Sequence, residues 1–179
     1  MLITVETQQN FGFKFGQNGA HSARTMMLSE LTQLFNNRPA EAQPADYRDD
    51  VEMVNILHKP TSRARSLTWR HLVDLYGMDT AIPLFRIFRQ FWETETEARP
   101  LLACQMALAR DPILRSSKEK ILSLQIGERL TREEMEQVYR DQFPNRFSPA
   151  MLKSLAQNVN GTWTNAGYLD GRSKKHRSE

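Results

Sequence analysis

Polar side chains on one predicted helix near the C-terminus have the chemistry needed to contact a nucleic acid. The helix is predicted to begin at Ser148-Pro149, because serine caps free backbone N–H groups and proline needs no hydrogen-bond partner at the first helical position. Its inner face is predicted to carry Leu152, Leu155, Ala156 and Val159. Its outward side chains are then Lys153, Ser154, Gln157 and Asn158. All four can hydrogen-bond to base edges or to phosphate oxygens.

Another helix is predicted directly before this one. Thr131 and Glu134 match a capping box, in which each side chain bonds a free backbone N–H of the other residue. The helix that starts there is predicted to stop at Pro144, because proline disfavours the helical conformation of the residue before it. With Gly161 as the predicted end of the following helix, the two helices form a helix-turn-helix pattern. In such a motif the second helix can enter the major groove of DNA.

The residues after these helices predict a small hairpin and a basic tail. Residues 162–171, which include Trp163, mix β-formers with turn residues and could form the wing of a winged helix. Residues 172–177 are predicted to be a disordered tail that pairs with phosphates. The candidate DNA-binding cations in the inter-helix turn and the tail are Arg146, Arg172, Lys174, Lys175 and Arg177.

Positive charge is concentrated in two parts of the chain. The net charge is only +3, but residues 140–179 contain seven Lys/Arg against three Asp/Glu, so the rest of the chain is close to neutral. The second basic segment is a helix that is predicted to begin at Thr61-Ser62 and to carry Arg63, Arg65 and Arg70. These arginines either bind phosphates or, in the alternative interpretation, pair with acids of the preceding helix or stay in water.

The spacing of apolar residues predicts an all-α protein with little β structure. The expected architecture is a multi-helix bundle over residues 1–127, with a helix-turn-helix or winged-helix-like portion over residues 128–171 packed on it. The basic tail follows over residues 172–179. The bundle is expected to begin with an irregular arm, in which residues 2–5 and residues 11–19 have strand-like patterns. One later helix is nearly apolar all round and is predicted to be central to the core.

Composition argues against a secreted or membrane-embedded protein. The single cysteine, Cys104, excludes an intramolecular disulfide and is expected to be a buried reduced thiol. There is no apolar signal segment at the N-terminus and no run near the roughly 18 apolar residues that are needed to cross a bilayer. We therefore expect a cytoplasmic protein without membrane contact.

The usual catalytic and metal-binding patterns are missing from the sequence. Gly12, Gly16 and Gly19 match neither the phosphate-binding Walker loop nor the dinucleotide fingerprint. The four histidines are never spaced four residues apart, as two metal ligands on one helix face would be. We therefore expect a protein that is not an enzyme and has no catalytic residues, metal or cofactor.

The order of these segments resembles the BrxA family of bacteriophage-exclusion (BREX) defence systems. The resemblance is carried by the Phe/Gly-rich residues 11–19, by the segment Val51…Asn55…Leu57…Thr61-Ser62…Arg70, and by Phe147-Ser148-Pro149-Ala150 with Lys153 and the closing Ala166-Gly167-Tyr168-Leu169. It implies a mostly helical protein with a winged-helix-like portion that binds double-stranded DNA with little sequence preference. It also implies a supporting role beside a methyltransferase and an ATPase in restricting phage. The chain departs from the family pattern at Trp163-Thr164 and in its basic tail.

Three functional hypotheses remain open at this point. The leading one is a DNA-binding accessory protein that neutralises phosphates, while the helix capped by Ser148 lies in or along a groove. The second is a protein–protein adaptor whose exposed helix faces dock onto larger subunits. The third is an RNA-binding helical bundle, which would prefer single-stranded loops to duplex.

Overall fold

The computed structural model describes residues 4–172 and 174–179, and most of them are helical. The α-helices are α1 Val5–Phe11, α2 Leu28–Asn37, α3 Pro44–Asp49, α4 Ser62–Tyr76, α5 Pro83–Thr94, α6 Arg99–Arg110, α7 Pro112–Arg115, α8 Lys118–Ser123, α9 Arg132–Gln142 and α10 Pro149–Asn165. The strands are β1 Arg129–Leu130, β2 Leu169–Asp170 and β3 Lys175–Arg177. A 3₁₀ turn at Ala20–Ser22 and a π-helical turn at Asp50–Val54 complete the regular structure. The all-α prediction is confirmed.

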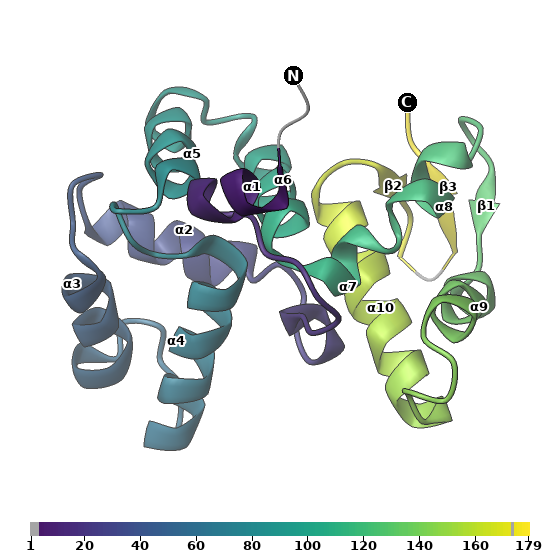
Figure 1. Ribbon diagram of the computed structural model, residues 1–179, viewed down its shortest axis with the longest axis horizontal. Coiled ribbons are helices and arrows are strands. Elements are labelled where there is room, and N and C mark those ends of the chain that lie inside the picture. The colour runs from purple at the N-terminus through teal and green to yellow at the C-terminus, as the bar shows by residue number, and fades with distance from the viewer. Residues whose placement is uncertain (1–3, 173) are drawn as a thin grey trace.

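Two lobes lie side by side in the molecule (Figure 1). The first contains α1 to α6, and the second contains α8 to α10 with the small sheet. Helix α7 and the 3₁₀ turn lie between them (Figure 1). Helix α8 falls within the predicted 1–127 bundle, yet it lies beside the sheet, and its Lys120 pairs with Glu134 of α9. None of the described helices is long and apolar enough to cross a membrane.

The N-terminal arm differs from its strand-like prediction. Residues 5–11 form α1, which is capped by the Thr4 side chain and ends at Gly12 with φ 121°. Residues 12–19 are irregular and form no strand. Leu2 and Ile3 lie outside the described residues. The local hydrogen bond from Thr7 N to Thr4 Oγ1 supplies a helix start that the β-prone residues do not indicate.

Aromatic side chains from α2, α3 and α5 form the core of the first lobe. Phe35 of α2 contacts Tyr47, Phe85, Phe88 and Trp92, with ring centroids 5.2 to 6.1 Å apart. The prediction that one helix is apolar all round and central to the core is only partly right for α5. Phe85, Phe88 and Trp92 are buried, but Ile87 and Phe91 are 42% and 48% exposed. The outer face of α5 is therefore apolar and open to solvent.

Along the chain of the second lobe, the two longest helices, α9 and α10, come after strand β1 and before strands β2 and β3. Both predicted helix starts are confirmed: Thr131 and Glu134 form the capping box of α9, and Ser148 Oγ accepts from Met151 N at the start of α10. Strand β3 lies in the middle of the sheet, antiparallel to β1 and to β2. The sheet therefore joins a segment that precedes the two helices in the sequence with two segments that follow them. This pairing holds the sheet beside α10.

The prediction that α10 ends at Gly161 is wrong, and so is the hairpin over residues 162–171. The helix continues to Asn165, and Trp163 is a buried helical residue whose Nε1 donates to Ser117 Oγ at 2.7 Å. Packing of this indole outweighs the helix penalty of glycine, which is about 1 kcal/mol. The left-handed glycine that follows the end of the helix is Gly167 instead, with φ 83°.

The predicted disordered tail is also corrected, because residues 175–177 form β3. His176 pairs with Arg129 of β1 and with Asp170 of β2. Ser173 lies outside the described residues. The C-terminus is therefore the centre of the sheet, and its basic residues are placed by strand pairing.

Candidate nucleic-acid interface

Helix α4 carries two of its three arginines on one exposed face. Arg63 and Arg70 are seven residues apart, which is close to two helical turns, so they share that face. Within the described part of the chain, neither guanidinium forms an ion pair or a hydrogen bond. Arg65 is turned elsewhere, because its Nη1 donates to the Glu52 carbonyl at 2.7 Å. Arg65 therefore ties α4 to the preceding turn, and its Nη1 is engaged within the protein.

The N-terminal half of α10 presents the predicted polar face. Lys153, Ser154 and Gln157 are exposed, and the whole helix contains no acidic residue. Asn158 does not belong to this face. It is half-buried, and its Nδ2 donates to the His21 carbonyl at 3.1 Å. Three of the four predicted contact residues of α10 are thus open to a ligand, while Asn158 joins α10 to the first lobe.

Arg146, in the turn between α9 and α10, is held by the protein itself. Its guanidinium lies 5.2 Å from the Phe143 ring centroid and 5.0 Å from that of Phe147. Its Nη2 donates to Asn18 Oδ1 at 2.8 Å. Arg146 therefore fixes the turn against the N-terminal segment, and only its remaining donors could reach a phosphate.

The basic residues of the C-terminus divide into two groups. Arg172 and Lys174 lie in the connection between β2 and β3 and are exposed. Lys175 donates to the Gly171 carbonyl, and Arg177 donates to the Tyr168 carbonyl at 3.0 Å with its guanidinium 4.9 Å from the Tyr168 ring centroid. Arg172 and Lys174 are the pair that can reach a ligand.

Arg24 is a further exposed cation that the sequence analysis missed. It lies in the irregular segment after the 3₁₀ turn, next to Thr25, whose Cγ2 would be 3.5 Å from a Cβ built on Gly161 of α10. On its other side Arg24 comes near His71 of α4: burial lowers the pKa of His71, and the charges of Arg24 and Arg70 lower this pKa further. Arg24 therefore lies between α4 and the C-terminal half of α10. No periodic pattern could reveal this, because the residue is not in a helix.

Helix α9 has a different electrostatic character. Its charged side chains pair with one another and with α8 through Arg132–Glu136, Arg140–Glu136 and Lys120–Glu134, at 2.9 to 3.2 Å. Such surface pairs contribute little to stability, but they cancel charge locally. Among the described residues, the exposed cations of the second lobe that form no ion pair are Lys153 on α10, Arg172 and Lys174 at the β2–β3 connection, Arg129 on β1 and Lys118 on α8.

A buried hydrogen-bond network holds α10 against the first lobe. His21 Nδ1 donates to Asp111 Oδ2 at 2.8 Å, and His21 Nε2 lies 2.8 Å from Thr162 Oγ1. The Asp111 carboxylate also caps α7 by accepting from the backbone N–H groups of Ile113 and Leu114. Burial raises the pKa of Asp111, but hydrogen bonds and charge from His21 outweigh it, so that the pKa lies below its ordinary value.

Thr162, His21 and Asp111 are arranged in space like the hydroxyl, the imidazole and the carboxylate of a hydrolytic triad, but a substrate has no access to them. All three side chains are fully or almost fully buried, and Thr162 Oγ1 also accepts from the Met26 N–H at 2.9 Å. A substrate could not reach that hydroxyl without opening the joint between the lobes. The network is therefore a structural joint that ties α10 to the 3₁₀ turn and to the start of α7.

The two helices with exposed cations project in the same direction. In Figure 1, α4 and α10 both descend from the centre of the molecule, and the N-terminal end of each helix is at the lower edge. Helix N-termini also carry partial positive charge, which favours phosphate. The arrangement places the N-terminal ends of α4 and α10 along one edge, and each of these helices carries exposed cations.

In comparisons with known proteins, no protein family and no curated protein matches the chain. Among the described residues, no three His, Cys, Asp or Glu side chains come together in a way that could hold a metal ion. What the edge can do chemically is to offer several unpaired cations and hydrogen-bonding side chains to an extended polyanion.

Proposed function

We propose that this chain is a double-stranded DNA-binding accessory protein. The observation that carries the proposal is a set of exposed cations that form no ion pair among the described residues. Its members are Arg24, Arg63, Arg70, Lys153, Arg172 and Lys174. The two helices that carry three of them, α4 and α10, have their N-terminal ends on the same side of the molecule (Figure 1), and we call this set the basic edge. Contacts from such cations to phosphates position a protein on a duplex without specifying the base sequence, so the proposed binding is sequence-tolerant.

Within this proposal, α10 is the helix that lies in or along the major groove. The order of elements in the second lobe, helix α8, β1, α9, α10, β2 and β3 with β3 between the other strands, supports a winged-helix unit. The connection between β2 and β3, which contains Arg172 and Lys174, would be its wing. Ser154 and Gln157 would then face base edges, while Lys153 contacts the backbone.

The first lobe would extend the footprint along the same duplex. Helix α4 resembles α10 in having a side-chain cap at its start, from Thr61. Its cation Arg63 lies in the first turn, and Lys153 of α10 lies in the second. Because both helices project toward the same edge, a duplex could lie across them with Arg24 in the middle. The resemblance to the BrxA family suggests the setting, which is phage defence beside a methyltransferase and an ATPase without catalysis by this chain.

The test is a fluorescence-anisotropy titration of the full chain against a labelled mixed-sequence duplex and its isolated strand. With about six phosphate contacts, the logarithm of the duplex association constant should fall with the logarithm of salt concentration with a slope of about −5. Affinity for the duplex should thus drop about 10³-fold between about 50 and 200 mM salt. The duplex should bind more tightly than the strand at each salt concentration.

Two outcomes would contradict the proposal and point elsewhere. If neither nucleic acid binds at low salt, the exposed cations do not serve a polyanion and the adaptor hypothesis gains support. If the single strand binds more tightly than the duplex, the basic edge serves unpaired nucleotides, as expected of an RNA-binding protein.

A further inference from the structure

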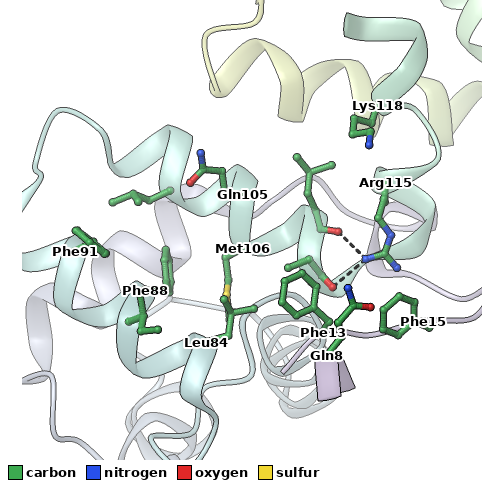
Figure 2. Close-up of a pocket in the computed structure, with 14 residues that line it drawn as sticks. Gln8, Phe13, Phe15, Leu84, Phe88, Phe91, Gln105, Met106, Arg115 and Lys118 are labelled. Atoms are coloured by element: carbon green, nitrogen blue, oxygen red, sulfur yellow. Dashed lines mark hydrogen bonds between the residues drawn. The ribbon is translucent and has the colours of Figure 1, made fainter. Parts of the chain in front are cut away.

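An open apolar groove crosses the first lobe on a surface separate from the basic edge. It has a volume of about 720 Å³ and lies between α5, α6 and the segment that follows α1. Figure 2 shows Phe88 and Met106 in its middle and Phe91 toward one end. Ile87, Phe91 and Phe15 on its rim are between 41% and 48% exposed. This size is within the range of small-molecule sites, which are about 300–1,000 Å³ and mostly apolar.

The opposite end of the groove is positively charged. Figure 2 places Arg115 and Lys118 together at that end, away from Phe91. Arg115 is held in place, because its Nη1 donates to the carbonyls of Leu108 and Ala109 at 3.0 Å and its guanidinium lies 5.2 Å from the Phe15 ring centroid. Its orientation is therefore fixed before any ligand arrives.

These two cations have no carboxylate partner. Within the described residues, neither Arg115 nor Lys118 forms an ion pair, and no residue that lines the groove is acidic. Arg115 is half-buried, and burial lowers the pKa of its guanidinium, with only Asp111 acting in the other direction. A half-buried cation gains stability from an anion placed beside it. The groove is thus apolar along most of its length and has two cations, which favour an anion, at one end.

We propose that this groove binds an elongated apolar molecule with one anionic head, such as an acyl carboxylate. The chain of the ligand would lie along Phe88, Leu102 and Met106, and its carboxylate would lie between Arg115 and Lys118. The amides of Gln8 and Gln105 on the rim would remain free to solvent or to a polar substituent. This site is independent of the proposed DNA binding.

Isothermal titration of the full chain with three ten-carbon amphiphiles tests the proposal. Decanoate, decanol and decyltrimethylammonium, each kept below its micelle concentration, share the chain and differ in the head. Decanoate should bind one molecule per chain, at least about tenfold more tightly than the cation, with decanol between them. Equal affinities for the three heads would overturn the proposal, because the charged end would then contribute nothing.

Two charge-reversal variants separate this site from the basic edge. Lys118→Glu should weaken decanoate binding about tenfold, leave decanol binding unchanged and leave duplex binding unchanged. Lys153→Glu makes the same charge change on α10 and should leave decanoate binding unchanged. A Leu102→Trp variant, which fills the groove, should weaken both decanoate and decanol. Unchanged decanoate affinity in Lys118→Glu would contradict the proposal, and so would binding to decanoate-containing vesicles without binding to the monomer.

Discussion

The double variant Arg24→Glu with Lys153→Glu should bind duplex DNA about 100-fold more weakly than the native chain at low salt. Each substitution removes one phosphate contact and places a like charge beside the backbone, and a tenfold loss corresponds to about 1.4 kcal/mol. The slope of log affinity against log salt should become shallower by about two units, one for each lost contact. Anisotropy titrations at several salt concentrations measure both quantities.

Lys118→Glu is the matched control for this variant, because it makes the same charge change at the groove and away from the basic edge. It should keep native duplex affinity. The thermal unfolding of the double variant should also be native, since neither Arg24 nor Lys153 has a side-chain partner among the described residues. If the double variant binds the duplex as tightly as Lys118→Glu does, then α10 and the segment between the lobes are not part of the DNA interface.

Asp111→Ala should be the most destabilising single substitution at the joint between the lobes, by about 3–5 kcal/mol. Removing one member of a buried hydrogen-bonded pair leaves the other without a partner, and this cost is far larger than the net worth of the pair. Here the His21 ring and the N–H groups of Ile113 and Leu114 would lose their acceptor together. Chemical denaturation at neutral pH measures the loss.

The effect of Asp111→Ala should depend on pH with a definite sign. Because the pKa of Asp111 is lower in the folded chain than its ordinary value of 3.8, its stabilising contribution is complete above that value and is lost as pH falls through the folded pKa. The difference between native and variant unfolding free energies should therefore shrink below about pH 4. A difference that stays constant in acid would contradict the assigned role of the carboxylate.

Asp49→Ala supplies the comparison for this loss of charge. Asp49 is exposed at the end of α3, so its replacement should change the unfolding free energy by no more than about 0.5 kcal/mol. If the Asp111 and Asp49 variants unfold at the same denaturant concentration, the buried network does not join the lobes.

Local capping chemistry was sufficient to predict where the two C-terminal helices begin. Thr131 with Glu134, and Ser148 with Pro149, each satisfy free N–H groups through side chains within four residues, so the signal is complete in the sequence. The start of α4 at Thr61 is confirmed for the same reason. These starts place Arg63 in the first turn of α4 and Lys153 in the second turn of α10, which was enough to nominate them as candidates.

The end of α10 could not be predicted in the same way, because two glycines compete for it. Glycine is the residue type that most often follows a helix end, and Gly161 and Gly167 both qualify. Gly167 is the one that adopts the left-handed conformation, with Tyr168 N donating to the Trp163 carbonyl and Gly167 N donating to the Thr164 carbonyl. The contact between the Trp163 and Tyr168 rings, 5.0 Å between centroids, accompanies this turn. The choice depends on a core into which Trp163 packs, and that core is formed by distant residues.

Long-range contacts also determine which candidate residues have hydrogen-bond partners within the fold. Asn158, Arg65 and Arg146 have the right side chains, but each is engaged by a residue elsewhere in the fold: His21, Glu52 and Asn18. Arg24 has no pattern to mark it and gains its position only when the two lobes meet. Sequence spacing can indicate a face of a helix, whereas the partners that occupy that face are set by tertiary structure.

Mapping of backbone amide chemical shifts in the full chain during titration with a DNA duplex tests the central claim most directly. The account predicts that the largest shift changes occur around Arg24, in the N-terminal halves of α4 and α10, and at the connection between β2 and β3. Amides of α9 and of the groove between α5 and α6 should be unaffected. Shift changes centred on α9 or on the groove, or none at low salt, would contradict a duplex-binding edge formed by both lobes.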